Sequence, residues 1–245
     1  MNSALRQVVR HAVWLLLLCP LAAAAKPRQH KSAAPPAAAP KFSSQQALAR
    51  LMAGNRRYVT ARLQHPNQTV QRRREVAKGQ NPFAAVLSCA DSRVPPEVVF
   101  DGGLGDLFVV RNAGEVVDDP VTGSIEYAVE HLNVPLVVVM GHQACGAVKA
   151  AIAGQPEAHI TSIIEAIAPA VAEARSKPGD QVANTVEANV RLAARKLKQS
   201  QPVLAEAVGS PSGAHRIIPA KREINLTHTE RAFVSLLSLN AYALS

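Results

Sequence analysis

Two cysteines and one histidine lie where they could hold a metal ion together. The apolar run 84–88 ends on Cys89, and a second apolar run, 135–140, is followed by His142 and Cys145. Thiolate sulfur and neutral imidazole are ligands that zinc prefers in proteins. Three protein ligands with a fourth position open are typical of a catalytic zinc site, whereas a structural site normally has four protein ligands. The pattern therefore predicts a catalytic zinc site at Cys89, His142 and Cys145.

Two charged residues follow the first cysteine closely. Asp91 is two residues after Cys89, near enough to reach the metal or a water bound to it. Arg93 is two residues further on, and alternate residues of an extended segment lie on the same side. We therefore expect an ion pair between Asp91 and Arg93. Each residue alone has simpler roles, such as a core thiol or a surface ion pair, but the combination favours catalysis.

The cysteine content leaves a second interpretation open. The chain of 245 residues has three cysteines, of which Cys19 falls in a segment that we expect to be removed. Two cysteines in an exported protein would by default suggest one disulfide. What favours the metal site over a disulfide is the position of His142 and Asp91 beside Cys145 and Cys89.

The composition indicates a single globular domain without a nucleic-acid surface. Hydrophobic residues make up 48% of the chain, enough for a sizeable core, and aromatic residues only 4%. The formal charge is +9, which becomes +7 without Arg6 and Arg10 of the expected leader. The basic residues are scattered through helical stretches, and no aromatic-rich basic patch accompanies them. We therefore expect no nucleic-acid partner.

The first 42 residues are predicted to lie outside the folded domain. Residues 1–25 have a basic start, an apolar core at 12–21 and four alanines before Lys26, the pattern of a secretory signal peptide. The apolar core is shorter than the roughly 20 residues that span a membrane. Residues 26–42, rich in Ala, Pro and Lys, are predicted to be a disordered linker. We expect an exported, periplasmic protein that is not membrane-bound after signal removal.

The elements that must position the site alternate between strands and helices. Strands are predicted at 83–88, 107–110 and 136–140, with an edge strand at 215–218. Helices are predicted at 43–58, 69–78, 121–132, 145–153, 160–175, 181–199 and 202–208. This alternation predicts an α/β fold with a mostly parallel central sheet covered by helices. Ligands bind at the carboxyl ends of such strands, where Cys89 and His142 lie. The two N-terminal helices precede the sheet, so we expect them to pack outside the core or against a partner subunit.

Four motifs closely resemble those of the β-class carbonic anhydrases. They are Cys89-Ala90-Asp91-Ser92-Arg93, His142-Gln143-Ala144-Cys145-Gly146, the segment 106–114 (Asp-Leu-Phe-Val-Val-Arg-Asn-Ala-Gly) and the segment 124–128 (Ser-Ile-Glu-Tyr-Ala). The resemblance extends from about residue 43 to about residue 218. It implies a catalytic domain at 43–220, followed by a divergent C-terminal segment at 221–245.

The resemblance implies a zinc enzyme that reversibly hydrates carbon dioxide to bicarbonate and a proton. In this family the reaction proceeds by attack of zinc-bound hydroxide on carbon dioxide. Cys89, His142 and Cys145 would be the zinc ligands, and Asp91 and Arg93 would form a dyad beside the fourth position. The resemblance also implies a homodimer or homotetramer.

A finer resemblance concerns the substrate pocket. One subgroup of the family has an active-site glutamine, and another has a tryptophan that serves a regulatory bicarbonate pocket. Gln80 occupies the glutamine position and Val86 the tryptophan position. The resemblance therefore implies that Gln80 donates a hydrogen bond to the substrate, that Phe108 and Tyr127 line the pocket, and that the bicarbonate switch is absent.

The C-terminal segment departs from the family pattern. The family usually ends with a strand, a Tyr-Asp type turn and a final strand, but residues 217–223 do not match this pattern. We expect a divergent surface extension here, and the apolar residues 235–244 are candidates for covering a subunit interface.

Two other functions stay open. The same scaffold supports a zinc hydrolase of carbonyl sulfide or carbon disulfide. A non-catalytic zinc or thiol protein is the other alternative, but it would have no need of Asp91, Arg93 and Gln80.

Overall fold

Three parallel strands form the centre of the sheet in this computed structural model. The structure describes residues 41–155, 158–204, 222–224 and 232–238. Strand β1 (Ala84–Cys89) pairs in parallel with β2 (Leu107–Asn112) on one side and with β3 (Leu136–His142) on the other. Every residue of β1 and β3 is buried, which is typical of parallel strands covered on both faces. The predicted α/β fold with a parallel centre is confirmed.

Two antiparallel strands extend the sheet beyond β3. Strand β5 (Ala232–Ser238) pairs with β3 from His142↔Ala232 to Leu136↔Ser238, and β4 (Arg222–Ile224) pairs with β5, which gives the order β2-β1-β3-β5-β4. This differs from the surface extension that we expected at 221–245. Backbone pairing satisfies the edge of β3 whatever the local sequence motif, which is why the motif comparison missed it. The predicted strand at 215–218, the residues of the helix 202–208 beyond 204, and residues 1–40 lie outside the described residues.

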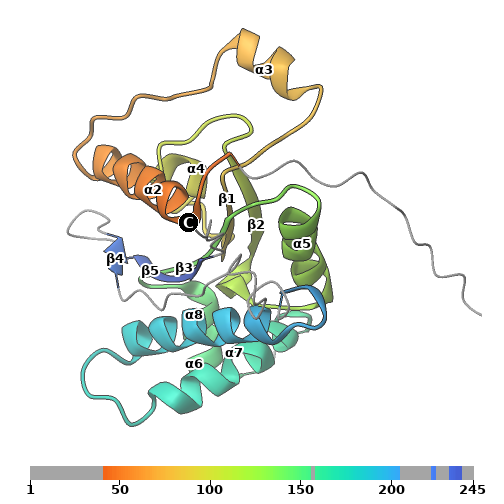
Figure 1. The fold of residues 1–245 in the computed structure, drawn as a ribbon. Coiled ribbons are helices and arrows are strands. Elements are labelled where there is room, and N and C mark those ends of the chain that lie inside the picture. The colour runs from red at the N-terminus through yellow and green to blue at the C-terminus, as the bar shows by residue number, and fades with distance from the viewer. Residues whose placement is uncertain (1–40, 156–157, 205–221, 225–231, 239–245) are drawn as a thin grey trace, which may run out of the picture. The chain divides into compact units, whose positions relative to one another are not determined.

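Helices α2 (Ser44–Val59) and α4 (Pro96–Val99) cover one face of the sheet, as Figure 1 shows. Alternate strand residues point to opposite faces, so Ala84 and Val86 of β1 pack on this side, in one cluster with Ala47 and Leu51 of α2. Of our two alternatives for this helix, packing outside the core is wrong, because Ala47 and Leu51 are one turn apart and bury one stripe of the helix. Packing against a partner subunit stays a prediction. By contrast, α3 (Val70–Val76) has no buried residue.

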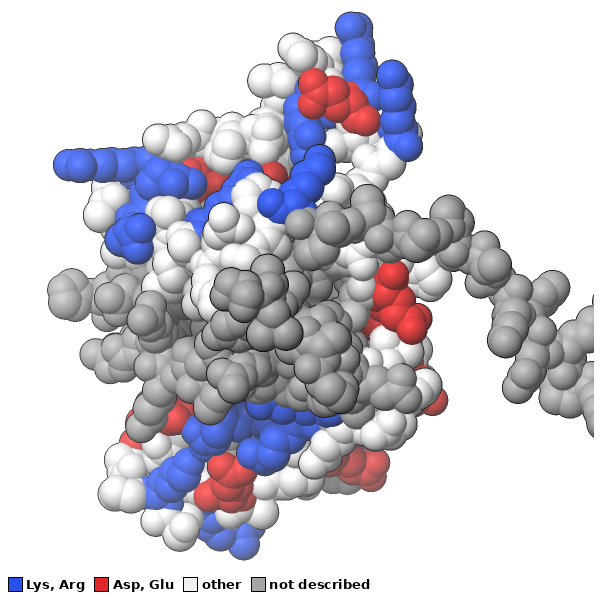
Figure 2. All heavy atoms as spheres, viewed as in Figure 1, with Lys and Arg blue, Asp and Glu red and all other residues white. Residues whose placement is uncertain are grey.

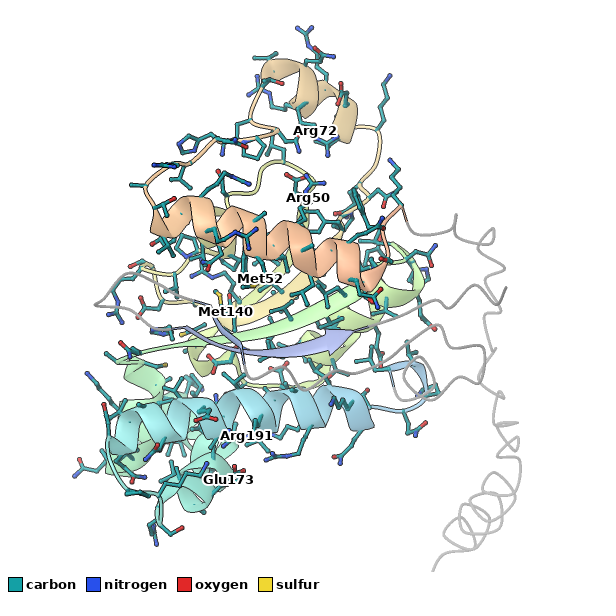
Figure 3. All side chains as sticks on the ribbon, turned by 60° about the vertical axis from the view of Figure 1, so that its left-hand side comes forward. Arg50, Met52, Arg72, Met140, Glu173 and Arg191 are labelled. Carbon is teal, nitrogen blue, oxygen red and sulfur yellow. The ribbon has the colours of Figure 1, made fainter. Side chains whose placement is uncertain are left out.

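Local features explain the start and the position of α2. The Ser43 side chain accepts from the Gln46 N–H, and the Gln46 side chain accepts from the Ser43 N–H, forming a capping box. A Cβ at Gly54 would lie 1.8 Å from the Phe100 carbonyl oxygen, so only glycine permits this approach to α4. Met52 points from α2 toward the sheet, where Met140 of β3 lies (Figure 3).

The opposite face of the sheet is covered by α5 (Asp119–Glu130) and α8 (Gln181–Gln199). Ala85 and Leu87 of β1 pack there against Ile125 of α5 and Leu197 of α8. Helices α6 (Gly146–Ala153) and α7 (Ile160–Ala174) follow β3 and pack with α8 (Figure 1). This layer is the one that reaches the ends of β1 and β3, where the predicted site lies.

Exposed ion pairs join α7 to α8. Glu173 of α7 lies 2.9 Å from Arg191 and 3.1 Å from Arg195 of α8, and Figure 3 shows Glu173 and Arg191 side by side. Figure 2 shows basic and acidic side chains next to each other over α3 and over these helices. Within the described ranges, no helix combines the length and the apolar character needed to cross a bilayer.

Candidate metal centre

Three potential ligands meet where neighbouring parallel strands end. Cys89 is the last residue of β1, His142 is the last residue of β3, and Cys145 immediately precedes α6. Because β1 and β3 are adjacent and parallel, their carboxyl ends lie side by side. The ligand atoms of the three residues all lie within 4.8 Å of one another, and all three residues are buried. The structure thus brings together the three residues that the sequence predicts.

The geometry of this group suits a zinc ion. Two sulfurs at about 2.3 Å from a tetrahedral zinc would be roughly 3.8 Å apart, and the Sγ atoms of Cys89 and Cys145 are 3.9 Å apart. Nε2 of His142 is buried and has no hydrogen-bond partner among the described residues. Buried polar atoms normally have a partner, and a metal at this place would supply one. The donor set and its spacing therefore fit zinc.

The alternative of a disulfide does not fit the structure. Both cysteines are free thiols, and 3.9 Å is almost twice the roughly 2.0 Å of a sulfur–sulfur bond. In the absence of a metal, the two thiols hydrogen-bond to each other. That contact lowers the pKa of Cys89 to about 4, with further help from His142 and the Gly114 N–H, and raises the pKa of Cys145. A metal would displace the proton that the pair retains.

His142 has two opposing influences on its pKa. Burial lowers the pKa, but the hydrogen bond and negative charge of Cys89 outweigh burial, and the net shift is upward. The imidazole lies 3.7 Å through Nε2 from Oδ2 of Asp91. A positive ion among these groups would replace the proton that the acidic surroundings favour on His142.

Asp91 and Arg93 form the predicted ion pair beside the Cys-His-Cys group. Arg93 donates from Nε to Oδ1 of Asp91 at 2.9 Å and from Nη2 to Oδ2 at 2.8 Å, and the Arg93 backbone N–H also donates to Oδ1. This bidentate pairing is the main reason that the pKa of Asp91 is far below its usual range. Asp91 is therefore an ionised acceptor at neutral pH.

Arg111 fixes the turn that carries Cys89 and Asp91. Its Nε donates to the Cys89 carbonyl at 3.0 Å and its Nη2 to the Asp91 carbonyl at 2.6 Å. In the sequence, Arg111 was noted only as part of the motif at 106–114. Its partners are carbonyl groups, which leave no trace in a sequence.

Two more polar residues near the site, Glu115 and Asn189, were not predicted from the sequence. Glu115 is 1% exposed, and burial, followed by the charge of Cys89, raises its pKa to about 8. Asn189 of α8 is also buried, and it donates to Oε1 of Glu115 at 2.9 Å. The available signal was an asparagine on the apolar face of α8, between Val186 and Val190.

The predicted pocket residues lie elsewhere within this chain. Phe108 pairs with Ala85, four residues before Cys89, which is about 13 Å along the strand. Tyr127 of α5 lies beside Phe108, with 6.2 Å between the ring centroids. Gln80 is exposed and precedes β1, whereas Cys89 ends it. The chain does not bring these three residues to its own Cys-His-Cys group.

The comparisons with known proteins agree with this site. The family model described as Carbonic anhydrase matches residues 84–219. Carbonic anhydrase 2 of Mycobacterium tuberculosis is 53% identical over 126 residues, which cover 49% of this chain and 61% of that protein. The chain spans about three fifths of the length of this relative and of the Carbonic anhydrase of Mycolicibacterium smegmatis.

Solved structures share the fold. The β-carbonic anhydrase CafA of Aspergillus fumigatus is 29% identical with a TM-score of 0.53, over 67% of this chain and 81% of that one. Two enzymes of Sordaria macrospora, described as tetrameric β-carbonic anhydrases, are represented by a chain with 24% identity and a TM-score of 0.53, over 69% of this chain and 89% of that one. With its family match over more than half of its length and a buried Cys-His-Cys group at the ends of two parallel strands, the chain belongs to the β-class carbonic anhydrase family.

Proposed function

We propose that this protein is a zinc enzyme that reversibly hydrates carbon dioxide to bicarbonate and a proton. The observation that carries the proposal is the Asp91–Arg93 pair beside the buried Cys-His-Cys group. A protein that only stores zinc needs the three ligands and nothing more. An ionised acceptor fixed next to the metal position serves a reaction.

Cys89, His142 and Cys145 would hold the zinc, which would supply Lewis acidity and so make a water a nucleophile at accessible pH. The two thiolates and a neutral imidazole leave the site near formal neutrality, so this acidification would be weaker than with three histidines. The protein contributes a buried site and a fixed set of neighbours.

Asp91 orients the nucleophile in this proposal. Its Oδ2 lies 3.7 Å from His142 Nε2, so the carboxylate faces the metal position. Both oxygens are engaged by Arg93, which leaves the remaining lone pairs of a fixed carboxylate to accept a hydrogen bond. The acceptor can thereby direct the nucleophile at the carbon of the substrate, a contribution of orientation rather than of charge.

We place the protein in the subgroup with an active-site glutamine, and the positions of the pocket residues make this assignment depend on an oligomer. Gln80, Phe108 and Tyr127 lie toward the amino end of β1, away from the Cys-His-Cys group at its carboxyl end. If they line the substrate pocket, they belong to the pocket of a second copy of the chain. The subgroup assignment therefore requires an oligomer.

The edge of the sheet supports a homodimer or a homotetramer. Strand β2 is the first strand in the sheet order, so one side of its backbone faces no other strand of the described sheet. Its residues Leu107–Asn112 are only half-buried, and Tyr127 beside it is 47% exposed. Pairing through a second copy would cover both. The Sordaria macrospora enzymes are described as tetrameric.

A direct test compares carbon dioxide, carbonyl sulfide and carbon disulfide as substrates. The purified zinc-loaded protein should hydrate carbon dioxide in stopped-flow measurements with a pH indicator, and Asp91→Asn should lose most of this rate while it keeps its zinc. Carbonyl sulfide and carbon disulfide, followed by sulfide release, should be poor substrates. Faster turnover of either sulfur compound than of carbon dioxide would replace the proposal with a hydrolase on the same scaffold.

A further inference from the structure

One buried amide of α8 is tied to the segment that contacts the first metal ligand. Asn189 is 2% exposed, and its Nδ2 donates to the Gly114 carbonyl at 2.7 Å and to Oε1 of Glu115 at 2.9 Å. Both acceptors belong to the short helical turn η1 (Ala113–Glu115), which follows β2. The two hydrogens of one amide nitrogen are thus both used on η1.

The same turn donates a hydrogen bond to Cys89. The Gly114 N–H points at the Cys89 Sγ at 3.3 Å. Gly114 has φ of +74°, and a Cβ there would lie 2.7 Å from Cδ1 of Ile167 and 2.9 Å from Cβ of Ala147. Only glycine satisfies both the conformation and the space. A residue with a Cβ at this position would therefore disturb the turn from which the Gly114 N–H reaches the sulfur.

The turn does not hold this conformation by its own preference. Glu115, which is not a glycine, also has a positive φ, +41°. Residues other than glycine avoid this region unless their surroundings impose it. Asn189 donates to the carbonyl of Gly114, which is part of the peptide group that joins Gly114 to Glu115, and to the side chain of Glu115. Asn189 is therefore placed to impose the turn from the outside.

We propose that Asn189 is a positioning residue for the metal thiolate: it holds η1 so that the Gly114 N–H remains bonded to Cys89 Sγ. A hydrogen bond to a ligating sulfur withdraws electron density from it and so weakens its donation to the metal. In a site with two thiolates, this makes the metal a stronger Lewis acid. The inference rests on the proposed metal site, but the hydrogen bonds from Asn189 to η1 do not involve the substrate or the reacting atoms.

Cobalt(II) is the probe for the test, because thiolate-to-cobalt charge transfer absorbs in the near ultraviolet. Asn189→Leu keeps a similar volume and removes both donated hydrogens. The cobalt-loaded variant should absorb at longer wavelength than the wild type, because a sulfur without its hydrogen bond gives up electrons more easily. Its zinc affinity, measured by competition with a chelator, should nevertheless fall by about 10–100-fold, because Cys89 loses the neighbour that orients its sulfur toward the metal.

Asn184→Leu is the matched control on the same helix. Asn184 donates to the Pro178 carbonyl at 3.0 Å, away from the metal ligands, so its variant should keep the wild-type band and affinity. Asn189→Ala provides a second variant with a smaller side chain in case leucine does not fit the site. It should shift the band in the same direction.

The outcomes separate the inference from the proposed function. A wild type that binds neither zinc nor cobalt would refute the metal site itself. A wild type with a charge-transfer band that both folded Asn189 variants reproduce unchanged would refute only the role of Asn189. Failure of both variants to fold, when Asn184→Leu folds, would assign Asn189 a structural role and equally overturn the inference.

Discussion

Arg93 engages both carboxylate oxygens of Asp91, at 2.9 and 2.8 Å, so that Asp91 faces the metal position without occupying it. One of the ligand atoms, His142 Nε2, is 3.7 Å from Oδ2 of Asp91. A carboxylate at this distance could itself become a fourth ligand after a small rotation. We therefore expect the guanidinium to decide whether Asp91 is an acceptor beside an open metal position or a ligand that closes it.

Loss of Arg93 should inactivate the protein without releasing the metal. In Arg93→Ala, Asp91 is free to bind the zinc and exclude water, so zinc content should stay stoichiometric while hydration falls by at least about 100-fold, the scale of one removed positioning group. Metal analysis and stopped-flow hydration on the same sample check this. Arg195→Ala, which removes a similar ion pair with Glu173, is the control and should keep its rate. An active Arg93→Ala protein would show that the pair has no part in the reaction.

Glu115 predicts an unusual pH dependence of stability in the metal-free protein. Its pKa is raised from the ordinary 4.5 to about 8, so the folded chain retains a proton in this window that the unfolded chain releases. The contribution of Glu115 to the free energy of unfolding should therefore decrease as pH rises from 4.5 to 8, by up to about 1.4 kcal/mol per unit, whereas the lowered pKa of Cys89 acts in the opposite direction. Glu115→Gln should remove the Glu115 contribution, so the free energy of unfolding, measured in urea at several pH values, should have a more positive slope against pH than in the wild type.

Glu173 provides a control that separates the effect of Glu115 from a general effect of removing an acidic group. Burial raises the pKa of Glu173, but Arg191 and Arg195 outweigh it, and the net shift is downward. A depressed carboxyl pKa makes stability vary with pH only below the ordinary value. Glu173→Gln should therefore keep the slope between pH 4.5 and 8, and an unchanged slope in Glu115→Gln would contradict the assignment.

Val86 predicts ordinary product inhibition by bicarbonate. Val86 is fully buried in β1 and packs in the core with Leu51 and Val138, at the position where a regulatory tryptophan occurs in the other subgroup. Hydration should rise toward alkaline pH, and added bicarbonate should inhibit without cooperativity near neutral pH. Rates measured from acid to alkaline pH, with and without bicarbonate, check both points. A steep cooperative loss would refute the subgroup and the role of Gln80.

We also propose export, on the basis of the N-terminal sequence alone. Cells that express the full chain should yield a mature form that begins near Lys26, recovered from the periplasmic fraction and identified by N-terminal sequencing. Recovery of the intact chain with Met1 from the cytosol would contradict it.

Two of the metal ligands, Cys89 and His142, could be predicted from the sequence because each lies at the end of a short apolar run. Such runs are buried parallel strands, and their carboxyl ends meet at one edge, so Cys89 and His142 had to be close. The ends of α8 were also predictable, from Asp180 as its N-cap and a long apolar stripe.

The features of the fold and the site that were not predicted depend on contacts between segments that are far apart in the sequence. Strand β5 is defined by its pairing with β3, about 95 residues earlier, as the register Met140↔Val234 shows. Glu115 carries a charged side chain that a sequence assigns to the surface, yet Asn189, 74 residues away, gives it a buried partner. Neither relationship has a local pattern. The family motifs indicated which segments matter but not which backbone groups they bind.

The most direct test of the metal site measures zinc content and carbon dioxide hydration together, in the wild type and in Cys145→Ser. The Cys145 sulfur lies 3.9 Å from that of Cys89 and is buried, so a hydroxyl in its place would be a weak and badly placed ligand. We predict stoichiometric zinc and rapid hydration in the wild type, and the loss of both in Cys145→Ser. A Cys145→Ser protein with full zinc and the full rate would contradict the site and the function proposed from it.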